Sequence, residues 1–344
     1  MDFSKRSRSE WFQLLVLVLL IAAFPLLLPS DRKDHGATRA VFDQALLEKM
    51  RRRGPNICMI GNSMLDTRID KLLFNRLTRP NSTSFIADGG TRSTVWYFKL
   101  KNFAGALNPP PKVVFIFYRD YDFTRPWLHL EGERLETART FMKPEDEDVL
   151  AFARKLGGVA PASGLDFYWP EQLTLDLRKR VSRLAIDAGA IGQGKTGDTL
   201  LEEQLNGLFD FQNLRANVFD AGAAANDLVP ADTKRFTADP ASNLLTQFDS
   251  FARERGIRLV FYRVKRRPND QNEVIQDADL RAYTADFQAW AERQGHALID
   301  ETGDPRLTLS MYHDGDHLGK HAMAEYTRLF LERVKMVLPL PPAP

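Results

Sequence analysis

Short apolar runs, bounded by glycine, proline or polar residues, recur along the chain. Runs of this length that contain β-branched and aromatic residues are typical of buried strands. The clearest of them is KVVFIFY. The full set of expected strands is Asn56–Ile60, Ser84–Ala87, Lys112–Tyr118, Ile257–Val264 and Ala297–Asp300.

Between these runs, apolar residues recur at helical spacing, so that each intervening segment has one apolar face. Strands that alternate with helices pair in parallel and carry helices on both faces of the sheet. We therefore expect an α/β fold, a three-layer sandwich with a mainly parallel central sheet. The positions that define these helices are Leu65, Ile69, Leu72 and Leu73; Trp96, Leu100 and Phe103; Leu244, Leu245, Phe248 and Phe251; Leu280, Tyr283, Phe287, Trp290 and Ala291; and a last helix over about 319–336.

The rhythm of strands and helices changes at the front of the chain and in its middle. Residues 1–30 hold a short basic tip and a long apolar run, and residues 31–53 form a polar connector. The α/β domain occupies residues 54–340, and a polar, glycine-containing segment at about 128–240 is interpreted as a partly helical insertion into it. There is no fixed-period repeat, and the chain ends in a short proline-rich tail.

The apolar run near the front is long enough to cross a membrane. Trp11–Pro29 contains 19 residues without a formal charge, about the length needed to span the hydrocarbon core as a helix. A cleaved signal peptide and a retained anchor both explain it. We expect an uncleaved, single-pass anchor, because the run exceeds a usual signal core and AFPLLLPS offers no small-x-small cleavage site. Basic residues before the run favour a cytoplasmic amino end and an exported domain: Lys5, Arg6 and Arg8.

Charge and cysteine content exclude some classes of protein. The net charge is +2, from 47 basic and 45 acidic residues, so the chain has no overall basic field for nucleic acid. The single cysteine, Cys58, excludes an internal disulfide, and its position in an apolar run is typical of a small core residue.

One perfect motif match lies inside the insertion. Gly189–Thr196 satisfies the phosphate-loop pattern G-x-x-x-x-G-K-T, which binds nucleotide phosphates only between a strand and a helix. The preceding stretch is charged and helical in pattern, and Gly197-Asp198 follows where the helix should begin. We expect no nucleotide there, and no other cofactor in the chain.

Two segments far apart in the sequence carry the candidate chemistry. In ICMIGNSMLD, Ser63 stands between a strand and a helix, where it could be a nucleophile or only the cap of the helix. In HDGDHLGKH, Asp314 and His317 are separated by two residues. Such a pair can fix a histidine tautomer and take a proton from a serine hydroxyl. The histidines and carboxylates of this segment also include potential metal ligands, but no partner cluster accompanies them, and we expect no metal.

An early strand-Gly-Asn-Ser-helix junction, combined with a late Asp-x-x-His-Leu-Gly before the last helix, resembles the GDSL/SGNH hydrolase superfamily. The resemblance covers about residues 55–330 apart from the insertion, and implies an SGNH, flavodoxin-like fold. It implies that Ser63 is the nucleophile and that Asp314 and His317 complete a triad. It also implies oxyanion donors from the Ser63 N–H and from a glycine N–H, for which Gly89 or Gly90 is the candidate.

The third block departs from the family. After the third strand the family has Gly-x-Asn-Asp, whose Asn donates to the oxyanion, whereas this chain has Arg119-Asp120-Tyr121-Asp122. Loss of one such donor costs about 10²–10³ in rate. Arg119 either supplies donors or pairs with Asp120 or Asp122. Other candidates for contact with the substrate are Tyr121, in a set of aromatic residues that could stack on sugar, and Arg92.

This departure, together with the anchor, resembles the SGNH-like proteins of bacterial cell-surface O-acylation systems. The resemblance implies a domain in the periplasm or outside the cell, anchored in the inner membrane. It also implies an O-acyltransferase, most simply an O-acetyltransferase, that moves an acyl group through acyl-serine to a polysaccharide and works beside a membrane-bound O-acyltransferase. Two alternatives are an esterase that uses the same triad, and a glycan-binding or scaffolding subunit with weak or no catalysis.

Overall fold

The computed structural model describes residues 42–124, 130, 132–156 and 234–339. Its centre is a five-stranded parallel sheet in the order β2-β1-β3-β4-β5. This confirms the predicted α/β fold with a parallel sheet, and each predicted strand is present within a residue or so of its expected ends. The strands are β1 Ile57–Gly61, β2 Thr83–Ala87, β3 Val113–Tyr118, β4 Arg258–Arg263 and β5 Ala297–Asp300.

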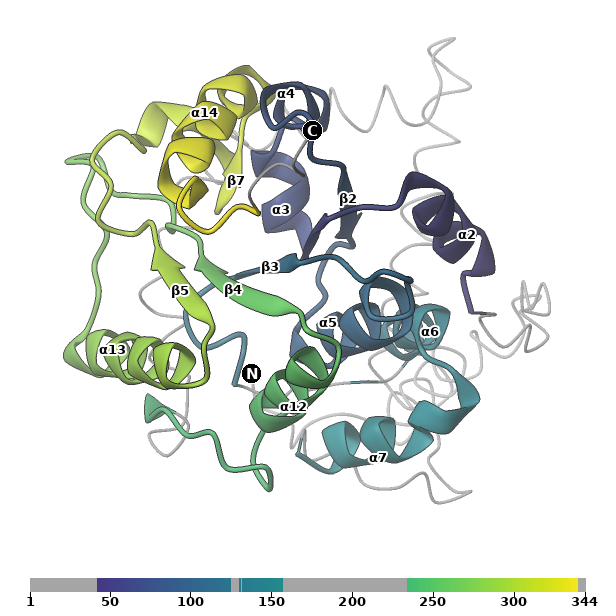
Figure 1. Ribbon diagram of the computed structural model, residues 1–344. Coiled ribbons are helices and arrows are strands. Elements are labelled where there is room, and N and C mark those ends of the chain that lie inside the picture. Colours follow the sequence, from purple (N-terminus) through teal and green to yellow (C-terminus); the bar gives the residue numbers. More distant parts are fainter. Residues whose placement is uncertain (1–41, 125–129, 131, 157–233, 340–344) are drawn as a thin grey trace, which may run out of the picture. The chain divides into compact units, whose positions relative to one another are not determined.

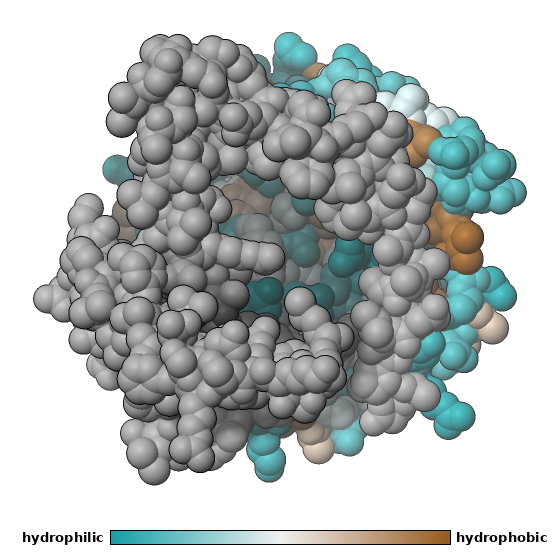
Figure 2. All heavy atoms as spheres, turned by 180° about the vertical axis from the view of Figure 1, so that it is seen from behind, coloured by the Kyte–Doolittle hydropathy of each residue, from teal (hydrophilic) through white to brown (hydrophobic). Residues whose placement is uncertain are grey.

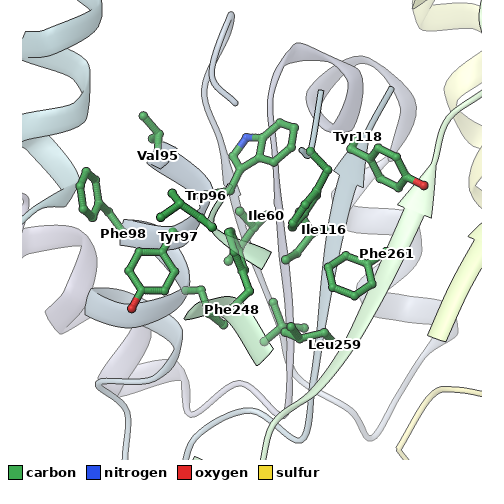
Figure 3. Close-up of a cluster of buried hydrophobic side chains, with 14 of the residues drawn as sticks. Ile60, Val95, Trp96, Tyr97, Phe98, Ile116, Tyr118, Phe248, Leu259 and Phe261 are labelled. Atoms are coloured by element: carbon green, nitrogen blue, oxygen red, sulfur yellow. The ribbon is translucent and has the colours of Figure 1, made fainter. Parts of the chain in front are cut away.

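Alternate strand residues enter two separate hydrophobic clusters, one on each face of the sheet. Cys58 and Ile60 of β1 belong to the larger cluster, and Ile57 and Met59 belong to the smaller one. Figure 3 shows the larger cluster, where Ile60, Ile116 and Phe261 meet aromatic residues of the covering helices. Both faces of a parallel sheet are buried in this way when helices cover each of them.

Helices cover both faces, which gives the three layers (Figure 1). Over the smaller cluster lie α3 Ser63–Arg68, α4 Lys71–Leu77 and α14 Met323–Val334. Over the larger one lie α2 Gln44–Arg53, α5 Ser93–Lys99, α6 Gly132–Phe141, α7 Glu147–Leu156, α12 Leu245–Glu254 and α13 Ala278–Arg293. A π-helix, Leu100–Ala104, extends α5, and single 3₁₀ turns occupy Pro144–Asp146, Leu309–Met311 and Lys320–Ala322.

The segment after β1 forms two helices where the spacing of its apolar residues predicts one. The spacing of apolar residues predicts one helix, whereas the chain forms α3 and α4 with a break at Ile69, which is extended. The Asp70 carboxylate then accepts hydrogen bonds from the backbone N–H groups of Leu72 and Leu73 and caps α4. As a result Leu72, expected on the buried face, is 85% exposed.

Several predicted segments lie outside the described residues. They are the apolar run 11–29, the phosphate-loop match 189–196 and most of the insertion, of which α6 and α7 are described. Within the described ranges, none of the helices has the length and apolar character that crossing a bilayer requires. The coloured surface in Figure 2 is mainly hydrophilic with a few hydrophobic residues between.

Candidate active site

The carboxyl ends of β1, β2 and β3 bring three polar segments to one edge of the sheet. The segments begin at Ser63, Asp88 and Arg119, and β1 lies between the other two strands. Gly61 allows helix α3 to start directly over the sheet: a Cβ there would lie 2.9 Å from Leu65 Cβ and 3.1 Å from Phe117 Cβ. This close packing places Ser63 at the edge where parallel sheets gather their ligands.

Asn62, rather than Ser63, is the cap of helix α3. The Asn62 Oδ1 accepts a hydrogen bond from the Met64 N–H at 2.9 Å, and its Nδ2 donates to the Thr91 carbonyl at 3.3 Å. Both contacts are made by the side chain of Asn62, so the residue before the serine acts here through more than its backbone. Since Asn62 supplies the cap, the Ser63 hydroxyl is available for chemistry.

His317 reaches that hydroxyl from the other end of the sequence. Its Nε2 lies 2.8 Å from the Ser63 Oγ, so the hydroxyl can donate to the ring when Nε2 is unprotonated. A small antiparallel ribbon, β6 Tyr312–Asp314 and β7 His317–Leu318, carries the histidine and sets the backbone of Asp314 opposite that of His317. The side chain of Asp314 lies outside the described part of the chain, so its place in a triad stays a prediction.

The segment after β2 forms a tight loop beside the serine. Gly90 has a φ of +68°, a left-handed conformation that glycine adopts readily and other residues rarely do. The Thr91 hydroxyl donates to the Asp88 carbonyl at 2.8 Å, and Trp96 Nε1 donates to Thr91 Oγ1 at 3.1 Å. Together with the bond from Asn62, these contacts fix the loop against the start of α3.

Backbone N–H groups are available at this point for an oxyanion. Ser63 is the first residue of α3, where the N–H has no partner within the helix. Among the described residues, neither the Ser63 N–H nor the Gly89 or Gly90 N–H has a recorded hydrogen-bond acceptor. These are the donors that the family resemblance implies, and their segments follow β1 and β2, which are neighbours in the sheet.

Arg119, which follows β3, forms ion pairs with aspartates. Its Nη1 pairs with the Asp316 carboxylate, and its Nε lies 3.9 Å from Asp122 Oδ2. Asp120 pairs instead with Arg263 and Arg266. Of the two expected roles, Arg119 therefore has the structural one, an ion pair. Its nearest partner is Asp316, the residue before His317, rather than Asp120 or Asp122.

Asp316 is held from three directions, next to the histidine in sequence. Its Oδ1 accepts from the Arg267 N–H at 2.9 Å, and its carbonyl accepts from Arg68 Nη1 at 2.8 Å. Burial alone would raise the pKa of Asp316, but the charges of Arg119 and Arg266 and the hydrogen bonds outweigh it and lower the pKa. A charged Asp316 thus ties the backbone before His317 to the end of β3.

Arg68 was missed in the sequence, and Asp316 was considered there only as a potential metal ligand. Arg68 is fully buried on α3, and its Nη2 donates to the Lys265 carbonyl at 2.8 Å, which joins the serine helix to two other segments. An arginine among apolar residues of a short helix is not distinguishable from a surface arginine by spacing alone, because its acceptors are backbone carbonyls far away in the chain.

Of the two further candidates for contact with the substrate, Tyr121 is buried and Arg92 is partly exposed. Tyr121 is 3% exposed and packs edge-on against Tyr283, so the expectation that it faces the substrate is wrong: its ring is part of the core. Trp96 and Tyr118, two of the other aromatic residues that could stack on sugar, are also buried. Arg92 is partly exposed, and its Nε lies 3.5 Å from Asp122 Oδ1.

The residues considered as metal ligands have other contacts. His317 contacts Ser63, Asp316 pairs with Arg119, and His321 Nε2 lies 3.0 Å from the Ser310 carbonyl. In the part of the chain that is described, no three histidine, cysteine or acidic side chains gather as a metal site.

Comparison with known proteins finds distant structural likenesses. No protein-family model matches the chain, and no curated protein does. A solved structure of a proposed acylhydrolase from Bacteroides fragilis is similar with 11% identity and a TM-score of 0.35, covering 86% of this chain and 99% of its own. A proposed platelet activating factor protein from Streptococcus pneumoniae has 12% identity and a TM-score of 0.38, covering 96% and 99%. TM-scores this low support no conclusion about the reaction, which rests on the side chains described above.

Proposed function

We propose that this protein is a serine-dependent acyltransferase of the SGNH type that moves an acyl group from an ester donor to a polysaccharide hydroxyl. The single observation that carries the acyl chemistry is the 2.8 Å contact between His317 Nε2 and Ser63 Oγ. The two residues are 254 positions apart in the chain, and nucleophile and base within hydrogen-bond reach are the signature of an activated serine.

In the first half of the reaction, His317 Nε2 takes the proton from the Ser63 hydroxyl as Oγ attacks the ester carbonyl. The carbonyl π electrons move to its oxygen, which the Ser63 and Gly90 N–H groups stabilise. Collapse of this intermediate breaks the bond to the leaving alcohol, which takes the proton from His317, and leaves an acyl-serine. A sugar hydroxyl then gives its proton to His317 as it attacks the acyl-serine carbonyl. The bond from the acyl carbon to Ser63 Oγ breaks, and Oγ takes the proton back from His317.

The acceptor and the location are drawn from the sequence. The apolar run Trp11–Pro29 supports an exported domain with an inner-membrane anchor, and the resemblance to O-acylation proteins supports a glycan acceptor and a membrane partner that supplies the acyl group. When water replaces the sugar, the same residues make an esterase, so the two activities differ only in the acceptor.

The test is covalent labelling of the full chain with a fluorophosphonate and with an activated acetyl ester. We expect one adduct, on Ser63, that is lost in Ser63→Ala and strongly slowed in His317→Gln. A matched control is Ser310→Ala, which alters a serine at the exposed side of the histidine segment. A folded protein that forms no adduct with either reagent would contradict the acyl chemistry and favour a binding or scaffolding role.

Acetyl-labelled protein then separates the two acceptors. Mixed with oligosaccharide, it should transfer the label to sugar faster than it releases free acetate. Release of acetate at the same rate with and without sugar would show an esterase instead.

A further inference from the structure

The site has no asparagine where the family uses one as a donor, and two nearby donors are already engaged. Asn62 Nδ2 donates to the Thr91 carbonyl, and Arg119 pairs with Asp316 and Asp122. Tyr121 has a hydroxyl without a partner among the described residues, but its ring is packed in the core and its side chain is 3% exposed. Among the described residues, a third oxyanion donor must therefore come from another side chain at the same edge of the sheet.

Arg92 has donors to spare at this edge. A guanidinium carries five N–H donors. Among the described residues, the Arg92 side chain forms an ion pair with Asp122 alone, through Nε at 3.5 Å. Its side chain is 26% exposed, whereas that of Asp122 is 11% exposed. Arg92 is thus tethered at one end by a mostly buried carboxylate and can present its terminal nitrogens to a ligand.

The topology brings the segments of this ion pair to the same edge of the sheet as the nucleophile. Arg92 follows the loop after β2, and Asp122 follows β3, while β1 lies between these two strands and ends just before Ser63. The ion pair therefore joins the segments that follow the two strands on either side of β1. The bond from Asn62 to the Thr91 carbonyl further ties the residue before Arg92 to the residue before Ser63.

From this arrangement we propose that Arg92 is the third oxyanion donor, with its guanidinium held by Asp122 in place of the family's asparagine. The proposal rests on the proposed acyl chemistry at Ser63. A guanidinium N–H supplies both a donor and a positive charge to the oxygen that becomes negative when Oγ attacks. A charged donor of this kind makes a stronger hydrogen bond than a neutral amide.

The experiment measures the rate of Ser63 acetylation by neutral p-nitrophenyl acetate in the full chain. Removal of one oxyanion donor lowers rates by about 10²–10³, so we expect Arg92→Met to lose activity on that scale. Free guanidinium added to Arg92→Ala should restore part of the rate, which no purely structural role predicts. Arg293→Met, an exposed arginine before β5 and therefore at the opposite edge of the sheet, should acetylate at the wild-type rate.

Other outcomes separate the alternatives. If Arg92→Met acetylates at the wild-type rate, the proposal is wrong, although the adduct itself still supports the chemistry at Ser63. If the rate falls only for an ester with a carboxylate on its acyl chain, Arg92 binds a substrate anion instead, and the proposal is also wrong. Arg92→Gln, which keeps a polar side chain, serves the same test should the methionine variant fold poorly. Absence of an adduct in the wild type would contradict the proposed function rather than the role of Arg92.

Discussion

At the scale of single residues, Asn62 caps helix α3 and so leaves the Ser63 hydroxyl for its contact with His317. The hydroxyl of a serine that caps a helix usually accepts a hydrogen bond from a free backbone N–H of the first turn. Here Asn62 accepts from the Met64 N–H, and the Ser63 hydroxyl contacts His317 instead. The asparagine also fixes the loop after β2 through the Thr91 carbonyl, so one side chain positions two parts of the candidate site.

Two substitutions at Asn62 separate these contacts. Asn62→Ala removes the cap and should destabilise the protein by about 1 kcal/mol, measured by urea unfolding. Asn62→Asp keeps an acceptor for the Met64 N–H but cannot donate to the Thr91 carbonyl, so it should retain most of the stability and acetylate Ser63 more slowly. Equal stability of the alanine variant and the wild type would show that the cap is not needed.

At the scale of elements, helix α5 holds the loop after β2, residues 88–91, through a buried lysine. Lys99 is fully buried, and its Nζ lies 2.6 Å from Asp88 Oδ2, at the start of the loop that contains Gly90. Burial lowers the pKa of Lys99 to about 8, although the charge of Asp88 opposes the shift. The helix and the end of β2 are therefore joined by an amine that is costly to keep charged.

This lysine predicts how stability changes with pH. Between pH 8 and the ordinary lysine pKa of 10.5, the unfolded chain binds more protons at this residue than the folded one, so stability rises with pH. The slope due to one group is at most about 1.4 kcal/mol per pH unit. Cys58, whose pKa burial raises from 9.0 to about 12, acts in the opposite sense above pH 9, which makes pH 8–9 the clearest window.

The measurement is urea unfolding at several pH values for the wild type and for Lys99→Met. The difference between the two free energies of unfolding should change with pH between 8 and 9, because only the wild type carries the buried amine. Lys71→Met, which removes an exposed lysine paired with Asp66, is the control and should leave the pH dependence unchanged. Parallel curves for the wild type and Lys99→Met would contradict the prediction.

At the scale of the whole molecule, a buried carboxylate connects the layers beneath the site. Glu301, just past β5, is 1% exposed and accepts from Tyr262 of β4 at 2.6 Å and Tyr326 of α14 at 2.7 Å. Arg68 of α3 lies 3.6 Å away, and Arg333 of α14 lies 3.3 Å away. The serine helix and the last helix therefore share one anion in the core.

Loss of this carboxylate should leave the buried Arg68 with carbonyl acceptors in place of an anion, whereas Arg333 keeps its ion pair with Asp304. We expect Glu301→Ala to lower the free energy of unfolding by roughly 3–5 kcal/mol, which urea unfolding can measure. The matched control is Glu332→Ala, because that exposed glutamate pairs with Arg306 at 2.7 Å and should cost less than about 1 kcal/mol. Similar losses for the two variants would show that Glu301 does not connect the layers.

The pattern of the sequence predicted the sheet well and one helix poorly. The buried strands follow from local runs such as KVVFIFY, because a strand buried on both faces must be apolar throughout. The break at Ile69-Asp70 was missed because Leu72 continues the helical spacing of apolar residues. Asp70 accepts hydrogen bonds from the Leu72 and Leu73 N–H groups and so starts a new helix, in which Leu72 faces solvent. Periodicity records which positions can be buried, and the packing decides which of them are.

The sequence by itself determined the α/β alternation, since apolar periodicity is a local property of a chain, and its resemblance to a known family pointed to Ser63 and His317 as a candidate pair. Only the tertiary structure decided the partners of the polar side chains: Arg119 with Asp316, and Arg68 with the carbonyl of Asp316, 248 residues away. A buried charge takes whichever partner the folded chain brings near, and that choice depends on contacts between distant segments. Arg92, paired with Asp122 from the segment after β3, becomes a candidate for the same reason.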